Sequence, residues 1–228
     1  GGVYLLHHFF QQLQLRTWVS MRLRIAERNN HFSVTDRLLA MLYPMILGLN
    51  TMELKALLGT NGVFQYLTGL PKFPHPDTLR QFLITKAPVL HPRLQAVHNN
   101  LRAHFLGLPY PLTSLWFDFD STVRTLYGHQ EGVVKGYNPH QHGAKSYHPL
   151  LCTEAHRGDC LGGVLRYGND ASADGVLDML DEVLSLIPSG TRELRARADA
   201  GFYERDFMAK LSQNHIGFAV VADLTAPI

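Results

Sequence analysis

The sequence contains little cysteine and no long apolar run. Only Cys152 and Cys160 occur among the 228 residues, and they lack Cys-x-x-Cys spacing. This excludes a disulfide-built scaffold and favours a reducing compartment, so we expect a cytoplasmic protein. The longest apolar run, residues 38–49, is interrupted by Pro44 and is shorter than the roughly 17–25 residues of a membrane-spanning helix, so we expect no membrane association.

Several enzyme motifs are also absent. The sequence has no P-loop, no dinucleotide-binding glycine pattern, no nucleophile elbow and no zinc-protease helix motif. The net charge is only +2, but residues 1–110 carry 11 basic against 4 acidic side chains, whereas residues 111–228 carry 10 against 15. A protein in which one part binds a polyanion and another part has carboxylates in its functional site would show this asymmetry. Two solvated surfaces of unequal charge would show it as well.

The apolar spacing predicts two regions, residues 1–110 and residues 111–228. In the first, helical spacing predicts an all-helical region, with an N-cap at residues 34–36 and further helices over residues 52–58 and 77–83. Two short helices around a turn allow a helix-turn-helix unit that binds DNA, although a plain helical bundle has the same pattern.

Beyond residue 112 the apolar residues alternate, as they do in strands. We predict strands at 114–120, 123–127, 147–155 and 161–167, a helix at 176–187 capped by Ser172, a strand at 193–199, a helix at 203–214 and a strand at 217–222. This order describes an α/β fold with a mixed sheet flanked by helices.

Asp118 and Asp120 form the first candidate site. Both lie on the polar face of the first predicted strand, two residues apart. Carboxylates this close repel each other unless a cation lies between them, and hard oxygen ligands suit Mg²⁺ or Mn²⁺. A solvent-facing strand with acidic residues is the alternative interpretation.

Asp199 ends a later predicted strand, just before Gly201 allows the chain to turn. Ligands in open α/β sheets gather at the carboxyl ends of strands, so Asp199 and the first pair could share metal ions. Arg195 and Arg197 lie on the same strand face as Asp199. They could contact phosphate, or could pair with Asp199 or Asp118.

The loop at residues 137–148, together with Lys135, is the third candidate, as a contact for a phosphate backbone. Basic and aromatic side chains suit such a contact, whereas the irregular histidine spacing argues against zinc. An exposed loop without function is the alternative. The candidate DNA-binding residues here are Lys135, Tyr137, Asn138, His140 and Lys145, with Tyr147 close by.

Five segments together resemble the DDE transposases of bacterial insertion sequences. These segments are Asp118-Phe119-Asp120-Ser121-Thr122-Val123, Leu126-Tyr127-Gly128-His129-Gln130-Glu131-Gly132, Gly136-Tyr137-Asn138-Pro139, Ser146-Tyr147-His148-Pro149-Leu150 and Arg197-Ala198-Asp199-Ala200-Gly201-Phe202. The resemblance implies an RNase H-like catalytic domain that holds two Mg²⁺ (or Mn²⁺) ions through two aspartates and a glutamate. It implies cleavage and transfer of DNA strands at the inverted-repeat ends of an insertion sequence, with a homodimer assembled on DNA.

By motif, Asp120 matches the first aspartate of the family and Asp199 the second. Asp118 is interpreted either as a supporting carboxylate or, if the motif is aligned two residues earlier, as the first aspartate in place of Asp120. Ala200 replaces the serine that is more usual at its position. In the family the third carboxylate lies on a later helix, whereas this sequence ends at Ile228 and begins without methionine. We therefore expect a carboxyl-terminally truncated piece that is inactive in complete transposition. The rival hypotheses are a non-catalytic DNA-binding remnant and an RNase H-like nuclease without strand transfer.

Overall fold

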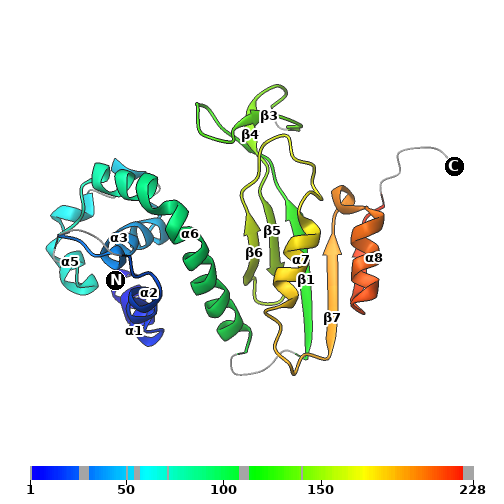
Figure 1. Cartoon of the computed structure of the whole chain (residues 1–228), viewed down its shortest axis with the longest axis horizontal. Helices are drawn as coiled ribbons and strands as arrows, with labels where there is room; N and C mark the ends of the chain where they lie inside the picture. The colour runs from blue at the N-terminus through cyan, green and yellow to red at the C-terminus, as the bar shows by residue number, and fades with distance from the viewer. Residues whose placement is uncertain are drawn as a thin grey trace. The chain divides into compact units, whose positions relative to one another are not determined.

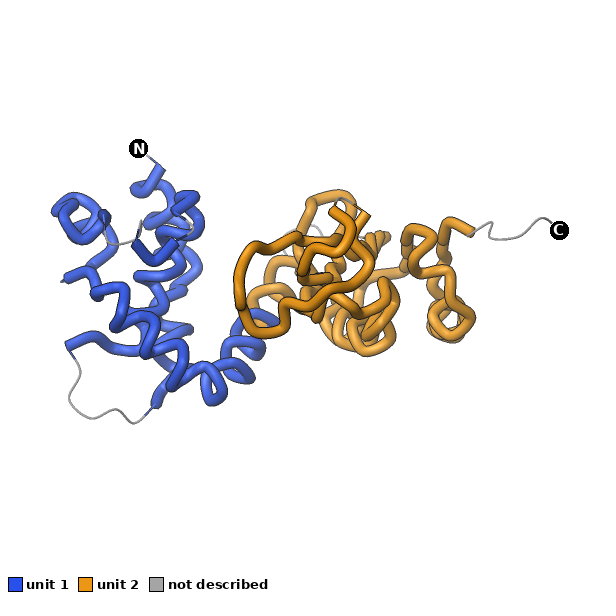
Figure 2. The backbone as a smooth tube through the Cα atoms, turned by 90° about the horizontal axis from the view of Figure 1, so that it is seen from above, with its two compact units in different colours: residues 1–99 blue, residues 100–228 orange. Residues whose placement is uncertain are grey.

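The computed structural model describes residues 2–25, 31–49, 51–53, 57–70, 72–107, 113–139 and 141–222. The chain divides into two compact units, Gly1–Asn99 and Asn100–Ile228, which Figure 2 shows in different colours. Within the described ranges, no helix is both long and apolar enough to cross a bilayer.

Unit 1 is helical in its described part, in agreement with the helical periodicity. Its elements are α1 (Gly2–Gln12), α2 (Leu15–Arg22), α3 (Val34–Ile46), the short 3₁₀ helix η1 (Leu57–Thr60), α5 (Gly62–Thr68) and α6 (Pro76–Leu106), which continues into unit 2. The core includes edge-to-face contacts that Tyr43 makes with Phe10 and Phe64. Part of the helix predicted at residues 52–58 lies outside the described residues.

Two predictions in the helical region are wrong in detail. The N-cap of α3 is Ser33, one residue before the predicted motif, and Asp36 completes a capping box with it. The helix predicted over residues 77–83 continues to Leu106 through Pro88 and Pro92. Proline costs a backbone hydrogen bond within a helix. Apolar residues before and after these prolines, such as Phe82 and Val97, are buried, and such packing favours the continued helix.

Unit 2 is built on a five-stranded mixed sheet, which confirms the α/β prediction. The sheet order is β6-β5-β1-β7-β8, formed by β1 (Ser114–Ser121), β5 (Leu150–Glu154), β6 (Cys160–Val164), β7 (Glu193–Ala198) and β8 (Gly217–Val220). Strand β1 is central: it pairs antiparallel with β5 and parallel with β7, and β7 in turn pairs parallel with β8. Figure 1 shows β1 between these neighbours.

Helices α7 (Val176–Leu184) and α8 (Arg205–Gln213) cover one face of this sheet. Apolar side chains of α7 and α8 form one buried cluster with Leu115, Phe117 and Phe119 of β1. The other face carries Trp116, Asp118 and Asp120, because successive side chains on a strand point to opposite sides. The helices therefore leave the acidic face of β1 open.

A second, three-stranded sheet follows β1 in the chain. It consists of β2 (Arg124–Thr125), β4 (Lys145–Tyr147) and β3 (Val134–Lys135), in the order β2-β4-β3. It lies beyond the end of the β1 arrow in Figure 1. The backbone makes a close approach here, because a Cβ atom on Gly136 would lie 1.9 Å from the carbonyl oxygen of Gly168.

The predicted strand over residues 147–155 is two strands in different sheets, β4 and β5. Pro149 separates them, and proline has no N–H for a ladder. Strand β3 was not predicted, because two residues are too few to show alternation. The N-cap of α7 is Gly175, at φ +77°, and not Ser172. Glycine adopts that left-handed conformation without steric cost.

We predict that Gly136→Ala destabilises the protein by about 1–3 kcal/mol, because the new methyl group meets rigid backbone. Urea denaturation followed by circular dichroism measures this change. Gly190→Ala is the matched control, since no atom lies within 4 Å of its Cβ position. Equal stability of the two variants would contradict the close approach at Gly136.

Candidate functional site

Asp120 and Asp199 lie at adjacent positions along the edge of the five-stranded sheet at which β1 and β7 end. In the parallel pairing of β1 with β7, Phe119 is opposite Ala198, and the next residues are Asp120 in β1 and Asp199 directly after β7. Neighbouring strands are about 4.8 Å apart, so the two side chains start from adjacent backbone positions. Both aspartates are exposed to solvent. The structure thus brings together the two strand ends that the sequence singled out.

The backbone around Asp199 fixes the orientation of its carboxylate. Asp199 is the N-cap of the 3₁₀ helix η2 (Ala200–Phe202), and its Oδ1 atom accepts a hydrogen bond from the Gly201 N–H at 2.9 Å. A cap that uses one carboxylate oxygen leaves the second oxygen for another partner. Within the described part of the chain, neither Asp199 nor Asp120 takes part in an ion pair.

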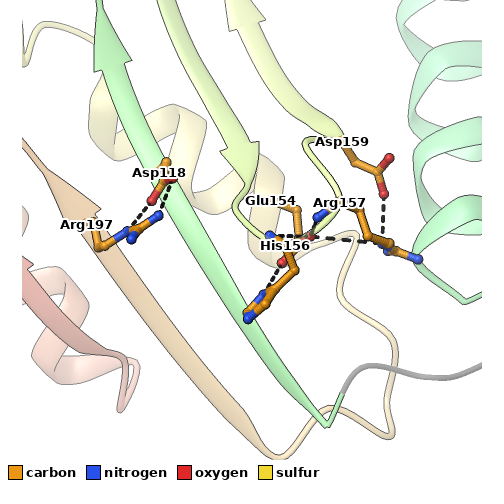
Figure 3. Close-up of polar contacts among 6 residues, drawn as sticks. All are labelled: Asp118, Glu154, His156, Arg157, Asp159 and Arg197. Atoms are coloured by element: carbon orange, nitrogen blue, oxygen red, sulfur yellow. Dashed lines mark hydrogen bonds and ion pairs between the residues drawn. The ribbon is translucent and has the colours of Figure 1, made fainter.

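Asp118, by contrast, is neutralised by Arg197. The arginine Nε and Nη2 atoms donate to the two Asp118 oxygens at 2.7 and 2.6 Å, as Figure 3 shows. The hydrogen bond to Asp118 raises the pKa of Arg197. The pairing with Asp118 that the sequence left open is therefore the one observed. Asp118 lies on the same face as Asp120 but, unlike Asp120, has a cationic partner among the described residues.

Arg195 and Arg197 also contact Trp116 on the open face of the sheet. Their guanidinium carbons lie 4.8 and 5.5 Å from the centroid of the Trp116 ring, within cation–π range. Arg195 pairs with Glu193 at 2.5 Å, and that hydrogen bond lowers the pKa of Glu193. Both arginines, predicted as DNA contacts, therefore already have carboxylate partners in the protein.

The candidate DNA-binding residues of the small sheet lie in different environments. Lys135 and Lys145 are opposite each other on β3 and β4, and Lys135 is exposed. Tyr137 is 75% exposed. Asn138 is buried; its side chain donates to the Thr125 hydroxyl and accepts from a backbone N–H, so it holds the loop and is not accessible to DNA. His140 lies outside the described residues.

Arg166 is a buried residue that sequence reasoning missed. It follows β6 and donates hydrogen bonds to Ser121 Oγ at 2.6 Å and to the carbonyl oxygen of His148 at 2.8 Å. It also donates to the carbonyl oxygens of Ala171 at 2.9 Å, Ser172 at 3.2 Å and Asp174. Burial lowers its pKa, an effect that Asp170 and Asp174 oppose. The sequence did contain a signal for this residue, because Arg166 is an arginine near the end of an otherwise apolar predicted strand.

Glu154 is a second buried group that sequence reasoning missed. It accepts hydrogen bonds from the His156 ring at 2.9 Å and from the backbone N–H groups of His156 and Arg157 at 3.1 and 2.7 Å (Figure 3). Burial raises the pKa of Glu154, but the hydrogen bonds together lower the pKa by more than burial raises it, so the net shift is downward. Glu154 has the core-facing parity of Leu150 and Cys152, which could have revealed its burial.

The residues at the sheet edge fit a divalent cation only as a partial site. Among the described residues, no three or more His, Cys, Asp or Glu side chains gather as a metal site. Mg²⁺ is commonly held by one or two carboxylates together with water and substrate phosphate. Asp120 and Asp199 meet that requirement, because they are adjacent, exposed and not paired with a cation.

A comparison with models of protein families identifies one family for this chain. The family model described as "Transposase DDE domain group 1" matches residues 1–227. A solved piggyBac transposase synaptic complex with hairpin DNA is 12% identical, with a TM-score of 0.45, covering 92% of this chain and 47% of that one. A Drosophila P element transposase strand transfer complex is 11% identical, with a TM-score of 0.38, covering 93% and 48%. The chain thus spans about half the length of these proteins. No curated protein sequence matches it.

We predict that Glu154→Gln costs about 2 kcal/mol at neutral pH, because hydrogen bonds to an ionised carboxylate are lost. The folded-state pKa of Glu154 is depressed, so its contribution is full above the unfolded value of about 4.3 and is lost as pH falls through the folded value. The stability difference between variant and wild type should therefore shrink on acidification. Urea titrations at several pH values measure it, with the exposed Glu131→Gln as the control; a difference independent of pH would contradict this role.

Proposed function

The chain belongs to the transposase DDE domain group 1 family, and on this premise we propose that it processes DNA in transposition, through metal-dependent cleavage and transfer of DNA strands. The DNA would be the inverted-repeat ends of an insertion sequence, brought together by two copies of the protein. The single observation that carries this proposal is the juxtaposition of Asp120 and Asp199 at the carboxyl ends of β1 and β7.

The electrostatics of the open face support a cation at this edge. Asp118 is neutralised by Arg197, and Glu193 is neutralised by Arg195. Asp120 and Asp199 have no such partner within the described residues. Uncompensated adjacent carboxylates repel each other, and a bound Mg²⁺ or Mn²⁺ ion relieves that repulsion. The cation would polarise the scissile phosphate and lower the pKa of an attacking water molecule.

Basic side chains near this edge suit the DNA backbone. The small sheet follows β1 directly and carries Arg124, Lys135 and Lys145, together with the exposed ring of Tyr137. Phosphate contacts position a DNA strand, and aromatic rings stack on unpaired bases. We assign these side chains to the DNA strand beside the carboxylate pair, and we assign Asn138 to the structure of the loop.

We predict that Asp120→Asn and Asp199→Asn each weaken Mn²⁺ binding by at least about tenfold, because each change removes one anionic ligand. Isothermal titration calorimetry of the chain with MnCl₂ measures this effect. Cleavage of a labelled DNA duplex in Mn²⁺ should be lost in both variants if the chain is competent to cut.

The matched control is Asp118→Asn. It removes a carboxylate from the same strand face, two residues from Asp120, but one that already binds Arg197. Its Mn²⁺ affinity should fall less than in Asp120→Asn and Asp199→Asn, because the carboxylate that is removed is already bound by Arg197. Equal losses in all three variants, or no loss in Asp120→Asn and Asp199→Asn, would refute the assignment of the site.

We predict that Lys135→Gln weakens DNA binding and lowers the slope of log affinity against log salt by about 0.9 for duplex DNA, as expected for one lost phosphate contact. Fluorescence anisotropy over a salt series measures the slope. Lys210→Gln is the control, because Lys210 pairs with Asp181 at 2.5 Å on the helical side of the sheet. A slope unchanged by Lys135→Gln would place the DNA elsewhere.

A further inference from the structure

The hydrogen bonds of Arg166 converge on segments next to both candidate ligands. On one side, Nη2 donates to the hydroxyl of Ser121, the residue that directly follows Asp120. On the other side, Nη1 donates to carbonyl oxygens of the loop at residues 171–174. Arg166 is only 8% exposed, so these bonds form away from bulk water.

The loop at residues 171–174 in turn packs against the backbone that orients Asp199. A Cβ atom on Gly201 would lie 2.7 Å from the Ser172 side chain and 3.1 Å from Asp199 Oδ1. The N–H of the same glycine donates to Asp199 Oδ1. The loop is held from within as well, because Asp174 accepts a hydrogen bond from the Ala171 N–H at 2.7 Å. Ser172 therefore lies directly beside the turn that presents Asp199.

We propose that Arg166 is a positioning residue that sets the spacing of Asp120 and Asp199 for a divalent cation. The inference rests on the proposed function and deepens it. One guanidinium connects Ser121, at the end of β1, to the loop that packs against Gly201, at the end of β7. The pairing of β1 with β7 and these contacts of Arg166 therefore both hold the ends of the two strands at a fixed distance from each other.

The chemistry of the guanidinium explains why an arginine occupies this position. Its five N–H donors form a rigid planar fork that can reach several acceptors at once, whereas a lysine ammonium has no such fork. The cation needs this rigidity, because Mg²⁺ accepts only near-octahedral ligand geometry. Groups that orient metal ligands through hydrogen bonds typically change metal affinity by 10- to 100-fold when removed.

The test compares Arg166→Ala with wild type by calorimetry with MnCl₂ alone, at a temperature where circular dichroism shows both to be folded. We expect an affinity loss of about tenfold or more in Arg166→Ala. Millimolar methylguanidinium, which can refill the vacated space, should restore part of the affinity. Arg166→Lys should stay weak, because it restores the charge but not the fork.

Arg157→Ala is the matched control. This arginine also donates a hydrogen bond to a backbone carbonyl, that of Phe105, but it lies in the turn between β5 and β6. The N–H of Ala155 in the same turn donates to the carbonyl oxygen of Trp116, near the start of β1 and away from its carboxyl end. The Mn²⁺ affinity of Arg157→Ala should equal that of wild type. If Arg166→Ala does not fold, Ser121→Ala replaces it, since it removes only the Arg166–hydroxyl bond and should weaken Mn²⁺ binding several-fold.

A folded Arg166→Ala protein with wild-type Mn²⁺ affinity would overturn the inference. If Ser121→Ala is tested in its place, wild-type Mn²⁺ affinity of that variant would overturn it as well. A lower melting temperature without an affinity change would count as the same result, because it describes a purely structural residue. These outcomes differ from failure of the proposed function, in which Asp120→Asn and Asp199→Asn themselves leave Mn²⁺ binding unchanged.

Discussion

The parallel pairing of β1 with β7 is the constraint on which the candidate site depends. Phe117 and Phe119 on β1, with Ala196 and Ala198 on β7, are all buried on the face that α7 and α8 cover. A shift of one residue would move these side chains to the open face, so the hydrophobic core strongly specifies the register. The adjacency of the two aspartates, one residue farther along each strand, follows from apolar packing.

Charge pairing on the open face then concentrates negative potential at one end of the sheet. Along β1 and β7, the carboxylates farther from this edge each have an arginine, as in the Asp118–Arg197 pair. Of the carboxylates in and directly after these two strands, Asp120 and Asp199 are the two that have no cationic partner among the described residues. An exposed pair of this kind costs little to keep in water and becomes favourable when a divalent cation arrives. We propose that buried Arg166 adds rigidity to that edge, because its guanidinium donates to Ser121 Oγ and to carbonyl oxygens of the loop at residues 171–174.

The sequence predicted the parts of this arrangement that follow from regular patterns. Strict alternation in β1 revealed which face is polar, and the motifs around Asp120 and Asp199 revealed the strand ends. Contacts between residues distant in sequence were either left open between alternatives or not predicted. The pairing of Asp118 with Arg197 depends on strand register, and the burial of Asn138 depends on a loop that folds back to Thr125. In the small sheet, β2 lies within the strand predicted at 123–127, whereas β3 was not predicted and the bounds of β4 were wrong, because strands of two or three residues are too short for a periodic signal.

The proposed function depends on a divalent cation held at the carboxyl ends of β1 and β7. The most direct test is a crystal structure of the chain grown with MnCl₂ and measured at the manganese absorption edge, where the metal gives an anomalous signal. We expect an anomalous peak between the carboxylates of Asp120 and Asp199, within about 2.0–2.6 Å of an oxygen of each. A peak bound elsewhere, with both aspartates facing only water, would contradict it.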